Sequence, residues 1–225
     1  MKEKGLQESW LDNSLKKLIY GSWWQQPPSV GASEWIDDAY VAFPKLVHDS
    51  LKQKVLYEVN ANWFESPEFQ VLSQSLLKSF KVDAELLHNI DVLITLPHAS
   101  LLEGRVEYAE SMQQLVKVLS IRGKRVGIKY HPREESSDPL ELAGQSGVIL
   151  LPAVLAFEVL LPGLGNAVTV GDVSTTLLSS KWLRPALRTI AVASGDYQKQ
   201  FLDLYQSLGI EVVNDASVLV RKLQD

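Results

Sequence analysis

The feature that most constrains this chain is a series of short apolar segments, each followed by a turn signal and then a helical pattern. The first, Ile90 to Leu96 (IDVLITL), is almost wholly apolar, as expected of a strand buried on both faces of a parallel sheet. Strands are also predicted at 55–59, 126–130, 148–151, 167–170, 189–193 and 210–213, and helices at 66–80, 105–121, 138–144, 153–161, 175–183, 197–208 and 216–223. This alternation predicts an α/β fold: a Rossmann-like parallel sheet of about six or seven strands with helices on both faces.

The first part of the chain has a different character. A helix is predicted over residues 9–20, and a connector rich in tryptophan and proline follows it. Trp23, Trp24 and Trp35 either pin this connector to a core or form a platform on which a sugar stacks. We therefore expect residues 1–54 to be an N-terminal helical, Trp-rich accessory segment and residues 55–225 to be the Rossmann-like domain.

Composition excludes several classes of function. The 225 residues carry a formal net charge of −5 and no cysteine. An acidic chain without Lys/Arg blocks is not expected to bind nucleic acid, and the lack of cysteine excludes thiolate catalysis and Cys-ligated zinc. The sequence has no apolar run long enough to span a bilayer and no signal-peptide pattern at its start. A cytoplasmic location is the expectation.

The segment Gly127 to Glu134 (GIKYHPRE) predicts a strand that stops abruptly and presents a histidine. Pro132 lacks an N–H and ends strand pairing, and it favours an extended backbone at His131. His131 would then lie at the carboxyl end of a parallel strand, which is where open α/β sheets bind their ligands. The alternative is an ordinary loop histidine before a turn-forming proline.

A second signal follows the predicted strand 167–170. Gly171 ends this strand, and Ser174-Thr175-Thr176 opens the next helix. Hydroxyl groups and free backbone N–H groups at a helix N-terminus make an anion site, although the same residues also serve simply as helix caps. No strand is followed by a GxGxxG or Walker pattern, so NAD and ATP are not expected as ligands.

The third signal is Glu158, which interrupts the otherwise apolar stretch LPAVLAFEVLLPGLG. A carboxylate buried without a partner costs several kcal/mol, so this side chain should face a ligand, a cation or solvent. Contact with a base or a ribose would explain it, and so would simple exposure at the end of a helix. No DxD motif and no Asp/His cluster at metal-ligand spacing is present, so no metal is expected.

Together, TLPHASLLEG, IKYHPRE, the apolar PAxxxxE helix and VGDVSTTL resemble the nucleotide-binding half of bacterial sialyltransferases and polysialyltransferases. The resemblance covers roughly residues 85–195 and implies the C-terminal, donor-binding half of a GT-B glycosyltransferase. It implies that His131 contacts the donor phosphate of CMP-sialic acid and acts as general acid. It further implies that Ser174 and Thr175 hold that phosphate and that Glu158 lies by the nucleoside. The flanking Lys129, Pro132, Arg133 and Gly171 complete the predicted donor-binding set.

These families also have an upstream acidic motif that supplies a general base. Glu3 is the candidate here, although Lys4 stands where the motif has a second acid, and the acceptor-binding domain has no counterpart in this chain. The resemblance implies sugar transfer to a saccharide acceptor without a metal or a cofactor, as in capsule or lipooligosaccharide synthesis. It also allows peripheral association with a membrane. Two alternatives stay open: a CDP-glycerol or other nucleotide-activated transferase, and a non-catalytic nucleotide-sugar-binding domain.

Overall fold

The computed structural model describes residues 10–25, 30–195 and 197–223. By its internal contacts the chain divides into two compact units, Met1–Ala61 and Asn62–Asp225. The division falls after Ala61 rather than after residue 54. The reason is that the strand at Val55–Glu58 pairs within the first unit and is not part of the large sheet.

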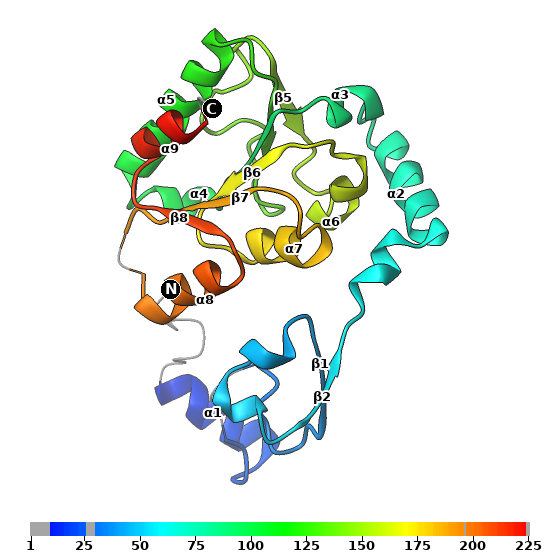
Figure 1. Ribbon diagram of the computed structural model, residues 1–225. Coiled ribbons are helices and arrows are strands. Elements are labelled where there is room, and N and C mark those ends of the chain that lie inside the picture. The colour runs from blue at the N-terminus through cyan, green and yellow to red at the C-terminus, as the bar shows by residue number, and fades with distance from the viewer. Residues whose placement is uncertain (1–9, 26–29, 196, 224–225) are drawn as a thin grey trace. The chain divides into compact units, whose positions relative to one another are not determined.

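The described residues of the first unit form one α-helix, two short 3-10 helices and a two-stranded parallel sheet (Figure 1). The sheet aligns Tyr40 with Tyr57, and the two rings stack with centroids 5.1 Å apart. Trp23 meets Trp35 edge-on at 5.6 Å, and both side chains are exposed. The elements are α1 (Trp10–Tyr20), β1 (Asp38–Val41), η1 (Pro44–Leu46), η2 (Asp49–Leu51) and β2 (Val55–Glu58).

The second unit is an α/β fold built on a six-stranded parallel sheet, which confirms the predicted Rossmann-like fold class. The strands are ordered β5-β4-β3-β6-β7-β8, so the chain starts in the middle, builds outward to one edge, and then returns to build the other. Their bounds are β3 (Val92–Thr95), β4 (Val126–Lys129), β5 (Val148–Leu151), β6 (Val168–Gly171), β7 (Thr189–Val192) and β8 (Glu211–Val213).

Helices cover both faces of this sheet (Figure 1). Helices α5 and α9 pack together on one face, while α7 and α8 cover the other, where α6, α2 and α3 continue the layer. The helices are α2 (Pro67–Ser79), α3 (Ala84–His88), α4 (Ala99–Leu102), α5 (Val106–Ile121), α6 (Phe157–Leu160), α7 (Thr175–Leu183), α8 (Lys199–Ser207) and α9 (Ala216–Lys222), with 3-10 turns η3 (Ala61–Glu65) and η4 (Leu161–Gly163).

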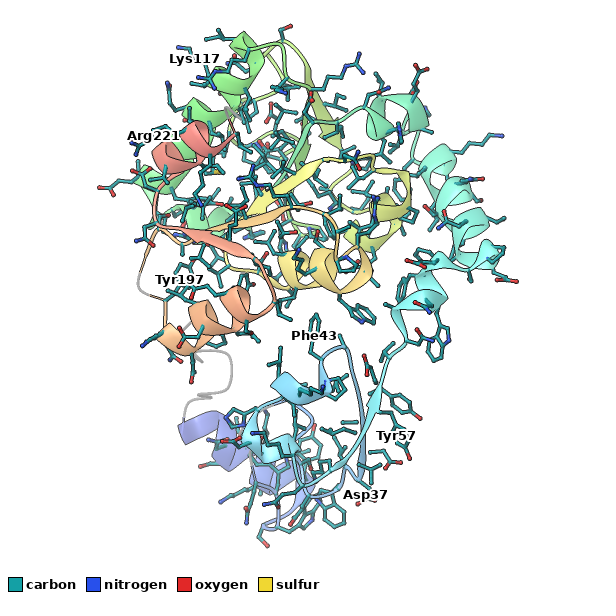
Figure 2. The ribbon with its side chains drawn as sticks, viewed as in Figure 1. Asp37, Phe43, Tyr57, Lys117, Tyr197 and Arg221 are labelled. Atoms are coloured by element: carbon teal, nitrogen blue, oxygen red, sulfur yellow. The ribbon has the colours of Figure 1, made fainter. Side chains whose placement is uncertain are left out.

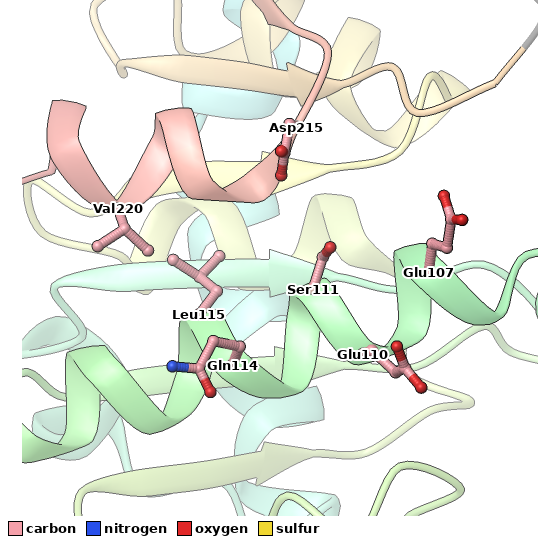
Figure 3. A pocket seen from close by; sticks show the side chains of 7 residues that line it. All are labelled: Glu107, Glu110, Ser111, Gln114, Leu115, Asp215 and Val220. Carbon is pink, nitrogen blue, oxygen red and sulfur yellow. The ribbon is translucent and has the colours of Figure 1, made fainter.

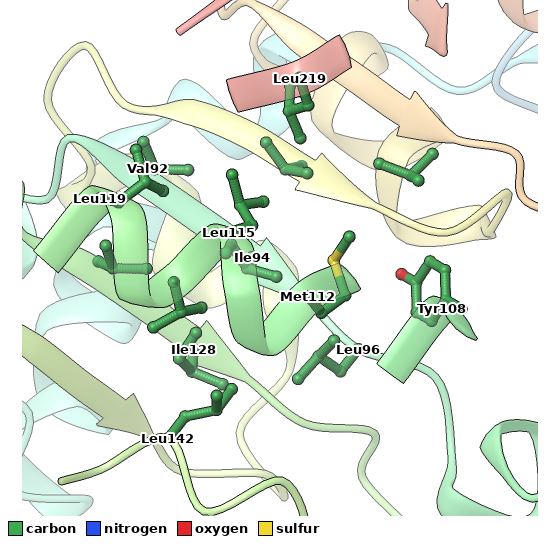
Figure 4. Close-up of a cluster of buried hydrophobic side chains, with 14 of the residues drawn as sticks. Val92, Ile94, Leu96, Tyr108, Met112, Leu115, Leu119, Ile128, Leu142 and Leu219 are labelled. Carbon is green, nitrogen blue, oxygen red and sulfur yellow. The ribbon is translucent and has the colours of Figure 1, made fainter. Parts of the chain in front are cut away.

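The main core lies between the sheet and α5 (Figure 4). Met112 and Leu115 on α5 pack against strand residues such as Ile94 and Ile128, and all four are fully buried. The opposite surface of this layer is polar, with Lys117 on α5 and Arg221 on α9 exposed (Figure 2). This one-sided apolar pattern is what the helical periodicity of residues 105–121 predicted.

Two predicted helices are wrong or too long. Residues 138–144 form turns, because the Asp138 carboxylate accepts the N–H groups of Leu142 and Ala143 at 3.0 and 2.8 Å and the Tyr130 hydroxyl at 2.6 Å. The helix predicted at 153–161 is reduced to α6 followed by η4, since a turn occupies the residues after Pro152. Among the described residues, no helix combines the length and apolar character needed to cross a membrane.

Candidate functional site

The order of the strands decides which loops can form a site. Strand β3 is paired in parallel with β4 on one side and β6 on the other. Successive strands are added towards one edge from β3 to β5 and towards the other edge from β6 to β8, so the order of addition reverses between β3 and β6. In open α/β sheets, ligands bind at the carboxyl ends of the strands beside such a switch point. The loops that leave β4, β3 and β6 carry His131, His98 and Ser174, respectively. The structure therefore brings the predicted histidine and serine motifs to one edge, with the end of β3 between them.

The strand ends that carry these loops are separated by a distance comparable with that across a hydrogen-bonded phosphate. Neighbouring strands lie about 4.8 Å apart, so the ends of β4 and β6 are separated by roughly 10 Å. A phosphate that accepts a hydrogen bond on each of two sides spans roughly 8 Å between its donors. Side chains that lean inward from the two loops can thus reach one anion.

His131 is half-buried two residues beyond β4. Its Nδ1 accepts the backbone N–H of Arg133 at 3.1 Å, so the sharp turn imposed by Pro132 orients the ring. Burial lowers the pKa of His131; the cations Arg133, His98 and Lys129 lower it further, and only Glu134 opposes them. The side chains of Pro132 and Arg133 are exposed at this rim.

Lys129 is the last residue of β4 and is buried, with 4% of its surface exposed. Its ammonium group donates to the carbonyl oxygens of Ala153 at 2.6 Å and Tyr130 at 3.1 Å. Burial lowers the pKa of Lys129 to about 8, against the opposing charge of Glu158. This side chain joins the β4 loop to the segment after β5, so its observed role is to hold those two segments together.

Glu158 lies in the first turn of α6 and is half-buried. It lines a cavity of about 40 Å³ together with aromatic and apolar side chains and Arg184. Arg184 directs its guanidinium to the carbonyl oxygens of Leu161, Leu164 and Gly165. Glu158 is close enough to Lys129 for its charge to act on that ammonium, it shares the cavity lining with Arg184, and it is partly open to solvent. An acid in this apolar stretch was expected to have a cation or solvent beside it.

Gly171 ends β6 where the sheet leaves no room for a side chain. A Cβ at this position would come within 2.2 Å of the Thr95 Oγ1 and 3.1 Å of the Thr95 carbonyl oxygen. The strands β3 and β6 can therefore pair closely at their ends only because residue 171 has no side chain. The structure gives Gly171 a packing role at the switch point.

Ser174 occupies the N-cap position of α7, but its side chain makes no capping hydrogen bond. The Tyr205 hydroxyl donates to the Ser174 carbonyl oxygen at 2.5 Å and so fixes the loop backbone from α8. The Leu177 N–H donates to the Ser174 carbonyl oxygen at 3.2 Å, whereas the N–H groups of Thr175 and Thr176, which precede it, have no carbonyl acceptor within the helix. Thr175 is exposed at the same helix start. The free N–H groups at the start of α7 and the Ser174 hydroxyl are the donors that an anion at this end of the helix would use.

Sequence reasoning missed a polar cluster behind this loop. Asp172, which is 7% exposed, pairs with the guanidinium of Arg105 and accepts the hydroxyl hydrogen of Tyr197 and the N–H of Val173. Arg105 also donates to the Ser194 carbonyl oxygen at 2.9 Å. The signal was an aspartate placed between a buried strand and a helix start, where an unpaired charge is costly. The cluster ties the loops after β3, β6 and β7 together.

Two atoms of this cluster have no partner among the described residues: the Nε of Arg105 and the hydroxyl of Tyr108. Tyr108 is 1% exposed, and the Arg105 guanidinium lies 4.5 Å from the centre of its ring. Burial, chiefly, and the nearby Asp172 carboxylate raise the pKa of Tyr108. A neutral phenol beside an ion pair at the strand ends is the arrangement that a buried water would complete.

The remaining predicted site residue, Glu3, lies outside the described residues. Among the described residues, no group of three or more His, Cys, Asp and Glu side chains is arranged to hold a metal ion. A separate cavity of about 310 Å³ lies between α5 and α9 and is lined partly by Glu107, Glu110 and Asp215 (Figure 3), but it contains none of the predicted site residues.

Neither protein-family models nor curated protein sequences match this chain. The fold and the geometry of the strand ends therefore carry the functional argument.

Proposed function

We propose that this chain is the donor-binding half of a nucleotide-sugar glycosyltransferase, with CMP-sialic acid as the donor. The observation that carries the proposal is the strand order, which sets the His131 loop and the start of α7 on either side of the end of β3. A phosphate between them is met by an imidazole, by helix N–H groups and by the Ser174 hydroxyl. In this proposal Glu158, in the first turn of α6, lies towards the nucleoside.

The chemistry of the transfer follows from where charge develops. As the bond between the sugar and the phosphate breaks, negative charge grows on the leaving phosphate, and fixed N–H donors stabilise it. His131, when protonated, donates its proton to the leaving group. The acceptor hydroxyl forms the new bond to the sugar and loses its proton to a general base, for which Glu3 is the predicted candidate. The negative charge of the bound phosphate raises the pKa of the imidazole, which offsets the lowering by burial and by Arg133.

Nucleotide binding tests this proposal most simply. A thermal-shift series compares CMP, CDP-glycerol and UDP, because a ligand at 100 times its Kd stabilises the folded state by about 2.7 kcal/mol. We expect CMP to give the largest shift and His131→Ala to remove it. A larger shift with CDP-glycerol would favour a glycerophosphate transferase instead. The absence of any shift at millimolar nucleotide, with the protein folded, would contradict all of these assignments.

Transfer itself separates an enzyme from a binding domain. Release of CMP from CMP-sialic acid, with water or a saccharide as acceptor, is expected to require His131. A chain that binds CMP but releases none from the sugar nucleotide would be a non-catalytic binding domain.

A further inference from the structure

Two imidazoles lie together at the candidate site, and the sequence singled out only one of them. His98 follows β3 and His131 follows β4, and these strands are neighbours in the sheet. The ring centroids are 5.7 Å apart, with the ring planes at 84° to each other. Both rings are partly exposed at the rim.

The backbone sets the same tautomer in both rings. The Nδ1 of His98 accepts the N–H of Ser100 at 3.2 Å, and the Nδ1 of His131 accepts the N–H of Arg133 at 3.1 Å. A ring nitrogen that accepts a hydrogen bond carries no proton, so in the neutral rings the proton is on Nε2. Each loop therefore holds its imidazole by Nδ1 and leaves Nε2–H as a donor.

A third contact joins the two histidine loops. The Glu134 carboxylate, three residues beyond His131, accepts the N–H of Ala99 at 2.9 Å. Ala99 directly follows His98, so this hydrogen bond fixes one loop against the other. The pairing of the imidazoles is thus built into the fold by a cross-link between loops.

We propose that His98 and His131 together bind one phosphate of the donor nucleotide, each through its Nε2–H. The proposal rests on the proposed function and extends it by a second binding residue. The site suits an anion because Arg133 and Lys129 are cations near His131, against the carboxylate of Glu134.

Helix capping alone is the competing explanation for His98. His48 in the first unit shows that such a cap exists without a second imidazole: its Nδ1 accepts the N–H of Ser50 at 3.3 Å and lies 2.8 Å from the Ser50 hydroxyl. The backbone angles at His48 (φ −58°, ψ 147°) and at His98 (φ −61°, ψ 144°) are nearly the same. His48 is therefore a matched control for the loss of the cap.

Two substitutions separate the two nitrogen atoms. In His98→Asn the side-chain oxygen replaces the Nδ1 acceptor, while the Nε2 donor is lost. In His98→Gln the side-chain N–H₂ replaces the Nε2 donor, while the cap is lost. Isothermal titration with CMP at pH 7 is expected to show at least about tenfold weaker binding for His98→Asn. It is expected to show binding within about threefold of wild type for His98→Gln and for His48→Ala.

The outcomes distinguish the two proposals. If the His98→Asn variant bound CMP as tightly as wild type, the proposal that His98 binds the phosphate would be overturned, while the proposed function would stand. A folded wild-type chain that binds no CMP would overturn the proposed function. The histidine pair is then decided by inorganic phosphate, followed through the ring ¹⁵N signals of the four histidines. Phosphate should raise the apparent pKa of the rings of both His98 and His131 and leave that of His48 unchanged. If phosphate left the apparent pKa of the His98 ring unchanged, the inference would be overturned.

Discussion

The ion pair between Arg105 and Asp172 is expected to be the main polar support of the loop that leaves β6. Its side chains are 23% and 10% exposed, so it lies between a solvent-exposed pair, worth at most about 1 kcal/mol, and a fully buried one, whose disruption costs about 3–5 kcal/mol. Asp172→Asn removes the charge at nearly constant volume and also weakens the hydrogen bond from Tyr197. We expect a loss of about 2–3 kcal/mol in the free energy of unfolding.

Urea unfolding at pH 7 measures this loss. With a slope of about 2 kcal/mol per M, the midpoint should fall by roughly 1–1.5 M. Arg105→Met should cost a similar amount, because it leaves the carboxylate partly buried without its cation. The double variant should lose at least about 1 kcal/mol less than the sum of the single losses, since the second change removes a group that is already unpaired.

A surface ion pair provides the control. Lys124 lies 3.7 Å from Asp91, and both side chains are more than 40% exposed, so Lys124→Gln should change the unfolding free energy by less than about 0.5 kcal/mol. A midpoint for Asp172→Asn that matches this control, or additive losses in the Arg105 cycle, would refute the reasoning. The β6 loop would then be held mainly by its other contacts, among them the hydrogen bond from the Tyr205 hydroxyl to the Ser174 carbonyl oxygen.

Three further variants test the packing and the titrating groups. Gly171→Ala should lower the melting temperature by several degrees, because the added Cβ would overlap the Thr95 Oγ1. Thr95→Ala in the same chain should recover most of the loss. An unchanged melting temperature for Gly171→Ala would be inconsistent with the close pairing of β3 and β6. The pKa of Lys129 falls from 10.5 to about 8 on folding, so the unfolded state binds more protons between these two pH values. In urea titrations the stability of wild type relative to Lys129→Met should therefore rise from pH 8 to 10.5. A difference in stability that does not change with pH would contradict the burial of this amine. Hydrogen bonds from Arg188 and Lys222 lower the pKa of Glu211 from 4.5 to about 2. The extra stability of wild type over Glu211→Gln should therefore be complete above pH 4.5 and disappear as the pH falls towards 2. Extra stability that persists at pH 2 would contradict this prediction.

The sheet was predictable from sequence because its strands are buried on both faces. A segment such as Ile90 to Leu96 has no polar face, and few structures other than a central parallel strand accommodate it. Helix α2 was equally readable, since the Ser66 side chain caps it by accepting the N–H of Phe69 at 3.2 Å and Pro67 is its first residue. Local rules sufficed wherever local contacts determine the structure.

The errors arose where one residue serves distant partners. Asp138 followed by Pro139 has the appearance of a helix N-cap and first helical position, yet the carboxylate accepts the Tyr130 hydroxyl and closes a turn. The partners Arg105 and Asp172 are 67 positions apart, and only the strand order brings them together. The pairing of His98 with His131 depends on the adjacency of β3 and β4 for the same reason.

A crystal structure with CMP bound would test the central claim most directly. The phosphate is expected between the loops that leave β4 and β6, with one oxygen within about 3 Å of the His131 Nε2 and another within about 3 Å of the Ser174 hydroxyl or the Thr175 N–H. A nucleotide bound elsewhere on the chain, or a phosphate that contacts only one of these two loops, would contradict the account.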